Sequence, residues 1–269
     1  LSRKKRKRKQ NRTPKSNKKQ RRKQEKQDKK RSIISKMQTS QKGAHISQVT
    51  TDAWSSQDIF EYLIKVLSMH TGKSTKVRKN PAPITPKHIV KLDVPPVSSS
   101  SSDNDKQPRL LLALKQLLES DSNISSDWCK HYTTPPKSLV QRVNGAPLVI
   151  VLCQSAVRCA ALFDDIKTSL NAKNVRVAKL FGRHFKMAKH VQFLNASFVN
   201  ICIGTPNRVE KLVLAEALSL SRLKYVIVDT KLNVKGFSVF ETRETSSDVQ
   251  EFFHDFWPIC ESHAKIVLL

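Results

Sequence analysis

The second half of the chain alternates short apolar segments with longer amphipathic ones. The apolar segments are rich in β-branched residues and have the length of buried strands, at 148–152, 175–180, 198–203, 224–228 and 265–269. Helical periodicity fills the intervals, at 155–170, 185–194, from 205 onward and around 249–257. Strands that alternate with helices predict an α/β fold over residues 147–269, with a single parallel sheet and helices on both faces.

The first half of the chain is more polar and less regular. Apolar residues at helical spacing predict helices at 55–70 and 109–118, and a stretch rich in proline and serine at 76–107 separates them. We therefore expect three regions: a basic arm with its linker at 1–50, helical segments with a Pro/Ser-rich linker at 51–146, and the sheet domain at 147–269.

The amino-terminal arm holds most of the charge. Residues 1–31 contain 18 Lys and Arg against two acids, a net of +16 within the +27 of the whole chain. Such a segment repels itself and has little to bury, which predicts disorder and a polyanionic partner such as nucleic acid. Its densest part has the composition of a nuclear localisation signal: Arg3, Lys4, Lys5, Arg6, Lys7, Arg8 and Lys9. A tail that only adds solubility is the alternative interpretation.

Several classes of protein are disfavoured. The charged start has no apolar segment behind it, so no secretory signal is predicted. The longest apolar run, residues 146–153, is far shorter than the ~20 residues of a membrane span. The five cysteines lack a Cys-x-x-Cys pair, which favours a reducing, intracellular compartment. The first residue, Leu1, and the apolar last strand suggest a piece of a longer protein.

The sequence Gly72-Lys73-Ser74 has the ending of a Walker A phosphate loop, but its context does not fit. The first glycine of that motif would fall at position 67, which is Leu67, and a predicted helix rather than a strand precedes it. Gly72 is better explained as a helix stop. We predict no phosphate-binding loop, no bound nucleotide, no metal and no cofactor.

The segment 198–230 has the pattern of a βαβ unit, and its polar residues follow the predicted strands. Thr205 and Arg208 come after the first strand, and Asp229 ends the second. The carboxyl ends of parallel strands share one edge of a sheet, where open α/β folds bind their ligands. We therefore expect these side chains to lie on one rim. Each also has a purely structural explanation, because Thr205-Pro206 suits a helix start, Arg208 can be solvated and Asp229 can cap a turn.

Residues 147–269 resemble the first RecA-like domain of DEAD-box RNA helicases. The hexapeptide IGTPNR at 203–208 resembles the TPGR motif, with Asn207 in place of its glycine, and YVIVDT resembles the strand that ends in the Asp-Glu-Ala-Asp box. Two further helicase motifs have weaker counterparts, in QSAVR at 154–158 and KLFGR at 179–183. The resemblance implies that RNA-backbone contacts are made by Ser155, Arg158, Gly182, Arg183, Thr205, Pro206 and Arg208.

The departures from the helicase motifs concern catalysis. Asp229 matches the first aspartate of the box, but Thr230 replaces the glutamate that orients the attacking water. Phosphoryl transfer also requires a Lys and amide cradle for the phosphates, which has no candidate here. We therefore expect a remnant of the box without ATP hydrolysis. A real RNA-dependent ATPase or helicase fragment is the alternative in the enzyme class.

A basic arm joined to a degenerate helicase-like domain resembles the Cms-type family of small-subunit pre-ribosome (processome) proteins. The resemblance implies a non-catalytic RNA-binding role in pre-rRNA processing, in the nucleus and nucleolus. Its implied partners are pre-rRNA or small nucleolar RNA and pre-ribosomal proteins, without a membrane. A chromatin or DNA-binding basic protein stays an alternative because the arm suits either polyanion. A Rossmann-type methyltransferase is disfavoured, since no Gly-x-Gly-x-Gly follows the first predicted strand.

Overall fold

The computed structural model describes residues 54–68, 82–94, 108–120, 144–169, 175–182 and 185–269. All of them belong to one compact unit, Gln48–Leu269, and the other unit, Leu1–Ser47, falls outside the described residues. The predicted basic arm, most of the Pro/Ser-rich linker and Arg183 therefore lie outside them too. Among the described helices, none combines the length and apolar character needed to cross a membrane.

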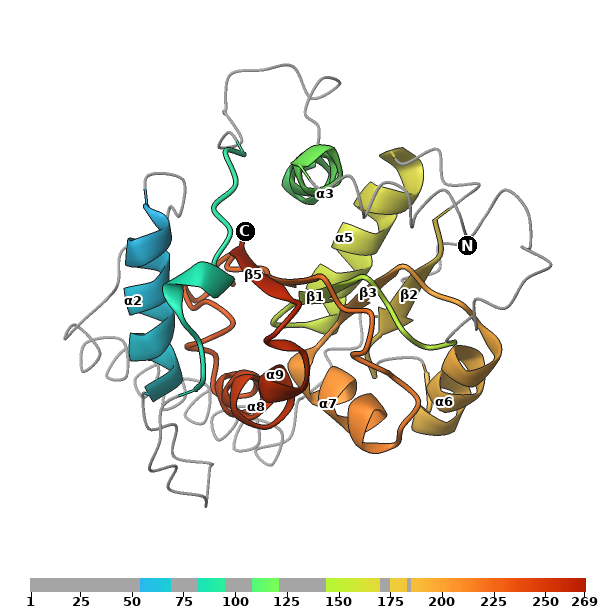
Figure 1. Cartoon of the computed structure of the whole chain (residues 1–269). Coiled ribbons are helices and arrows are strands. Elements are labelled where there is room, and N and C mark those ends of the chain that lie inside the picture. The colour runs from blue at the N-terminus through green and yellow to red at the C-terminus, as the bar shows by residue number, and fades with distance from the viewer. Residues whose placement is uncertain (1–53, 69–81, 95–107, 121–143, 170–174, 183–184) are drawn as a thin grey trace, which may run out of the picture. The chain divides into compact units, whose positions relative to one another are not determined.

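A five-stranded parallel sheet forms the centre of the described unit (Figure 1). Its strands, in the order β2-β3-β1-β4-β5, are β1 (Val149–Leu152), β2 (Val177–Leu180), β3 (Ile201–Gly204), β4 (Tyr225–Val228) and β5 (Lys265–Leu268). Every residue of β1, β3 and β4 is buried, as expected of parallel strands covered on both faces. The predicted α/β class with a single parallel sheet is confirmed.

Helices cover both faces of this sheet (Figure 1). Helices α3 (Arg109–Ser120) and α5 (Ala156–Ser169) lie on one face, and α6 (Met187–Ala196) and α7 (Pro206–Leu214) lie on the other. The last crossover is a composite of α8 (Ser246–Glu251), a π-helical turn at Phe252–Phe256 and α9 (Trp257–Cys260). Pro258 lacks the amide hydrogen that a regular helix would use there, which explains why the hydrogen-bond pattern loosens just before it.

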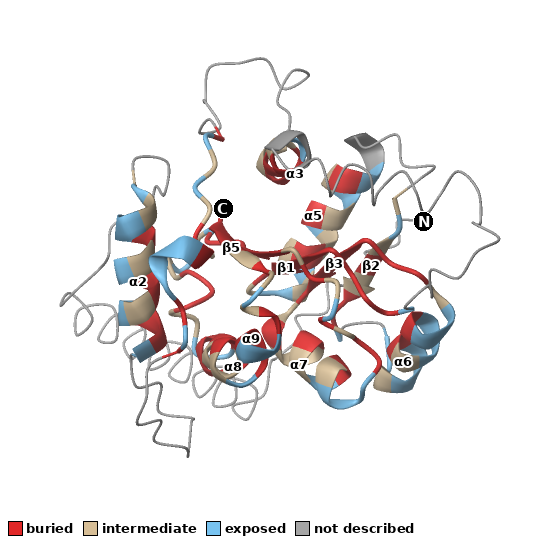
Figure 2. Cartoon of the chain, in the orientation of Figure 1, coloured by how far each residue is buried: buried red, intermediate tan, exposed pale blue. Residues whose placement is uncertain are grey.

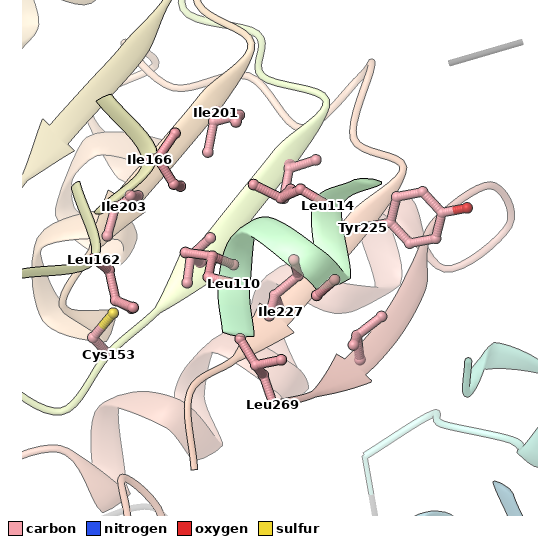
Figure 3. Close-up of a cluster of buried hydrophobic side chains, with 14 of the residues drawn as sticks. Leu110, Leu114, Cys153, Leu162, Ile166, Ile201, Ile203, Tyr225, Ile227 and Leu269 are labelled. Atoms are coloured by element: carbon pink, nitrogen blue, oxygen red, sulfur yellow. The ribbon is translucent and has the colours of Figure 1, made fainter. Parts of the chain in front are cut away.

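The hydrophobic core extends to residues upstream of the predicted domain start. Leu110, Leu114 and Leu117 of α3 pack in one cluster with α5 and the sheet (Figure 3). On the opposite side, Gln250 donates to the Val66 carbonyl of α2 (Ser56–Ser68) at 3.2 Å. A boundary at 147 therefore leaves out helices that complete the core, and Figure 2 shows buried residues on α3.

An extended segment continues the sheet beyond β5. Ile89 forms a single parallel bridge with Ile266, and the Val90 N–H donates to the Ile266 carbonyl at 2.9 Å. The segment follows the short 3-10 turn Pro86–His88 and is described to Val94, which is buried in the same cluster as α3. The sheet is thus flanked at β5 by residues that the sequence pattern assigned to a linker.

Candidate nucleic-acid interface

The polar residues predicted at the strand ends lie on one rim of the sheet. The last residues of the strands pair directly: Leu152 with Gly204, Leu152 with Val228, and Leu180 with Gly204. Because these strands are parallel and end level, the residues that follow β1, β2, β3 and β4 share one edge. The structure therefore brings together Ser155, Arg158, Gly182, Thr205, Pro206, Arg208, Asp229 and Thr230.

Arg158 and Asp229 form a bidentate ion pair across the rim. Arg158 Nε donates to Asp229 Oδ2 at 2.8 Å, and Nη2 donates to Oδ1 at 2.9 Å. The Asp229 side chain is 1% exposed and that of Arg158 is 22% exposed. Burial disfavours the charged guanidinium, but the hydrogen bonds and charge of Asp229 outweigh it and raise the pKa of Arg158. Both oxygens of the remnant aspartate are thus already bound by the chain itself.

Thr230 is held by the end of β5. Its amide and its hydroxyl both donate to the Leu269 carbonyl, each at 2.8 Å, and the residue is buried. Next to it, the Gln154 side-chain amide donates to the Lys231 carbonyl and its oxygen accepts from the Thr242 hydroxyl at 3.3 Å. We name Arg158, Asp229 and Thr230 the closed half of the rim, because each of these side chains is hydrogen-bonded to another group of the protein.

Ser155 has a local role at the start of α5. Its hydroxyl oxygen accepts from the Arg158 amide at 3.2 Å, and its carbonyl accepts from Cys159 at 2.9 Å. This is the hydrogen-bond pattern of a helix N-cap. The side chain is exposed, so a ligand at the rim can still reach it.

Arg208 occupies the other half of the rim and is bound by uncharged groups. Its Nη1 lies 3.4 Å from the Phe185 carbonyl, 3.7 Å from Met187 Sδ and 3.3 Å from His190 Nδ1. Within the described ranges, no carboxylate forms an ion pair with Arg208. Its positive charge is therefore positioned at the rim and available to an anion.

Gly182 explains how the guanidinium of Arg208 reaches this position. A Cβ atom added to Gly182 would lie 2.7 Å from Arg208 Nη2, so a larger residue would displace the guanidinium. Gly182 is exposed, and Phe185 follows it three positions later in the chain. We name Gly182, Phe185, His190 and Arg208 the open half of the rim.

The start of α7 differs from the cap that the sequence favours. The Thr205 side chain makes no capping hydrogen bond, and only its carbonyl accepts, from Arg208 at 3.0 Å and Val209 at 3.1 Å. Pro206 occupies the first turn, where its missing amide hydrogen costs nothing. Helix α7 thus begins without a side-chain acceptor on its first amides.

Sequence reasoning missed Phe185 and His190. The Phe185 ring is 43% exposed, and His190 is 4% exposed with its ring centroid 5.5 Å from that of Phe185. Burial, with a smaller contribution from the Arg208 charge, lowers the pKa of His190. Neither residue belongs to a motif, and only the mixture of Phe, His and Lys around 184–190 could have indicated a surface of this kind.

Three carboxylates meet between α7 and α8. Oxygens of Glu210, Asp248 and Glu251 all lie within 4.8 Å of one another. Burial, followed by the charges of Glu251 and Asp248, raises the pKa of Glu210 to about 7. The Asn207 side-chain amide donates to Asp248 at 3.4 Å and ties the GTPNR segment to this cluster.

Comparison with known proteins identifies the family. The family model described as CMS1, "U3-containing 90S pre-ribosomal complex subunit", matches residues 121–261, more than half of the chain. The chain belongs to the CMS1 family. Every described rim residue lies inside the matched region, whereas α2, α3 and β5 lie outside it.

Individual relatives from the CMS1 family match this chain in sequence over shorter stretches. Protein cms1 of Schizosaccharomyces pombe is 33% identical over 127 residues, covering 47% of this chain and 44% of its own length. Protein CMS1 of Chaetomium thermophilum is 34% identical over 103 residues, which cover 38% of this chain and 41% of that protein. Protein CMSS1 of Homo sapiens is 35% identical over 82 residues, which cover 30% of this chain and 29% of that protein. The chain thus spans less than half the length of these relatives.

One solved structure with a similar arrangement is Saccharomyces cerevisiae Dbp5 bound to Nup159, Gle1, IP6 and ADP. The match has a TM-score of 0.35 and 14% sequence identity, and it covers 48% of this chain and 30% of that one.

Proposed function

We propose that this CMS1-family chain is a non-catalytic RNA-binding factor in the biogenesis of the small ribosomal subunit. The family description, a subunit of the U3-containing 90S pre-ribosomal complex, supports the process and the setting. Pre-rRNA or small nucleolar RNA and pre-ribosomal proteins are then its partners, in the nucleus and nucleolus. The basic run at 3–9 would serve import.

The contrast between the two halves of the rim carries the proposal. Arg208 keeps a positioned positive charge that no described carboxylate neutralises. Thr205 and Pro206 begin α7 beside it, and helix N-termini favour phosphate oxygens. Gly182 and Ser155 complete a surface that can follow an RNA backbone, while the arm adds sequence-independent affinity.

The closed half supports the absence of catalysis. A metal-dependent nucleotide site needs an aspartate with oxygens to offer, whereas Arg158 binds both oxygens of Asp229. The position of the water-orienting glutamate is taken by Thr230, whose hydroxyl donates to Leu269. We therefore assign no nucleotide, metal or cofactor to this rim.

The segment beside β5 adds a second reason. A phosphate-binding loop joins a strand to the helix that follows it. Among the described residues upstream of β1, the extended segment 89–94 is followed in the sequence by α3, so a loop of this kind would lie between them. The sequence that joins them, residues 95–108, contains no glycine. Without glycine, backbone amides are poorly suited to wrap closely around a phosphate.

Two assays on the full chain test the proposal against its alternatives. We expect no ATP turnover above background, with or without RNA, whereas RNA-stimulated phosphate release would support an ATPase. In competition at fixed salt, we expect a folded small-subunit pre-rRNA segment to displace a labelled RNA better than duplex DNA does. Equal or better competition by DNA would favour a chromatin protein.

A further inference from the structure

The Phe185 backbone contacts the Arg208 guanidinium, and the Phe185 side chain is partly exposed to solvent. Arg208 Nη1 lies 3.4 Å from the Phe185 carbonyl, and 43% of the Phe185 residue surface is exposed. Large aromatic side chains of soluble proteins usually lose most of their surface to packing. An exposed ring and a positioned cation on the same surface can recognise a nucleotide, by stacking on the base and by charge on the phosphate.

His190 contacts both groups. Its ring packs against Phe185 at a centroid distance of 5.5 Å and an interplanar angle of 31°, and Nδ1 lies 3.3 Å from Arg208 Nη1. Because a guanidinium only donates, Nδ1 acts as the acceptor and His190 is neutral with its hydrogen on Nε2. Buried His190 Nε2 has no hydrogen-bond partner among the described residues. The Phe185 ring and the Arg208 charge therefore form a preorganised unit.

We infer that the open half of the rim binds one unpaired nucleotide of single-stranded RNA, with the base on Phe185 and a phosphate on Arg208. This inference rests on the proposed RNA-binding function and adds the form of RNA. Bases in a duplex are already stacked and paired, and the major groove of an RNA helix is too narrow for side chains to enter. Phe185 should therefore select single strands and contribute little to duplex binding.

The chain contains a matched control for Phe185. Phe193 is also 43% exposed, but it lies within α6, about 9 Å along the helix axis from Met187 at a rise of 1.5 Å per residue. Phe185→Ala and Phe193→Ala remove the same side chain and a similar exposed area. Only the first removes a ring that packs against His190 beside Arg208.

The test compares three RNA probes of equal length on the full chain: a single strand with bases, the same backbone with abasic positions, and a blunt duplex. Fluorescence anisotropy gives each dissociation constant at several salt concentrations. We expect wild type to prefer the strand with bases over the abasic strand by at least about fivefold. Added salt should weaken binding of both single-stranded probes by the same factor. The arm contacts phosphates, which both probes contain, whereas stacking on a base does not depend on phosphate charge.

The variants separate the two parts of the inference. Phe185→Ala should abolish the preference for bases, Phe185→Tyr should keep it, and Phe193→Ala should leave it intact. If Phe185→Ala keeps the wild-type preference, or if wild type has none, the stacking role is overturned while RNA binding stands. If Arg208→Ala leaves the affinity for all three probes unchanged, the proposed RNA-binding rim itself fails. Thermal unfolding of each variant shows whether the fold is retained.

Discussion

The two halves of the rim each contain one arginine, and the partners of the two arginines differ. In the closed half, Arg158 meets the buried carboxylate of Asp229 with two hydrogen bonds. In the open half, Arg208 meets a carbonyl, a thioether and an imidazole, none of which carries negative charge. The same residue type thus stabilises the fold after one strand and presents charge after the neighbouring strand.

The difference follows from burial and from what would remain after an arginine is lost. Without Arg158, the Asp229 carboxylate would stay 1% exposed and unpaired, which is costly in a low-dielectric interior. Without Arg208, the remaining groups are neutral and need no counter-charge. The closed half should therefore respond to substitution through stability, and the open half through binding.

The largest effect is expected for Arg158→Met. This change keeps the aliphatic stem but leaves Asp229 as a buried, unpaired charge, and breaking a buried pair in this way costs about 3–5 kcal/mol. Urea unfolding of the full chain should show that loss. RNA affinity, measured under conditions where the variant is folded, should change by less than about threefold.

A double variant distinguishes the ion pair from loss of packing. Arg158→Met combined with Asp229→Asn removes the unpaired buried carboxylate, so the double variant should be more stable than Arg158→Met alone. If the double variant is no more stable than the single one, the Arg158–Asp229 pair does not account for the loss.

A smaller effect, on binding alone, is expected for Gly182→Ala. The new methyl group would lie 2.7 Å from Arg208 Nη2, at the flexible end of that side chain. The guanidinium can move away at little cost to stability, but its position at the rim is lost. We expect RNA affinity to fall by up to about tenfold while the unfolding midpoint hardly changes.

The effect of Gly182→Ala should depend on Arg208. In an Arg208→Ala background there is no guanidinium to displace, so Gly182→Ala should have no further effect on RNA affinity. Additive losses in the double variant would contradict the displacement and indicate a separate contact at Gly182.

The smallest effect is expected for Glu210→Gln, and it depends on pH. Because the pKa of Glu210 is raised from 4.5 to about 7, the folded protein binds this proton more tightly than the unfolded chain. Its contribution to stability is therefore fully present below about pH 4.5 and is lost as the pH rises through 7. The variant should melt roughly 1–3 °C above wild type at pH 8 and match it near pH 4.

A control for Glu210→Gln is Glu244→Gln, which changes an exposed carboxylate outside the Glu210 cluster. It should leave the pH dependence of the melting temperature unchanged. Equal pH profiles for Glu210→Gln and wild type would show that the clustered carboxylates do not oppose folding.

The sheet could be predicted from the sequence because buried parallel strands are continuous β-branched runs. All five predicted strands exist, and their ends differ from the prediction by at most a few residues. The upstream helices α2 and α3 were also predicted, but their place in the core was not. The pattern shows that a helix has an apolar face, such as Leu110 and Leu114, without showing which surface that face covers.

The sequence predicted which residues lie on the rim, but not which of their side chains pair with one another. Strand ends placed Thr205, Arg208 and Asp229 on one edge, because that follows from parallel strands. That Arg158 rather than Arg208 meets Asp229 depends on side-chain geometry across 71 positions of sequence. Arg158 was predicted to contact RNA, and the structure adds a pairing of its guanidinium with Asp229 that the sequence did not indicate. Phe185 and His190 belong to no motif, because a single aromatic residue between His184 and Lys186 has no characteristic spacing.

The central claim, that the open half of the rim binds RNA, is tested most directly by the affinity of the full-length Arg208→Ala variant for single-stranded RNA. The control Lys189→Ala removes one exposed positive charge from neighbouring α6. We predict about tenfold weaker binding for Arg208→Ala, because a charge-assisted hydrogen bond to a phosphate is lost, and nearly wild-type binding for Lys189→Ala. The free energy of unfolding should change by less than ~0.5 kcal/mol, as is usual for surface substitutions. Equal affinities of Arg208→Ala and wild type would contradict the claim.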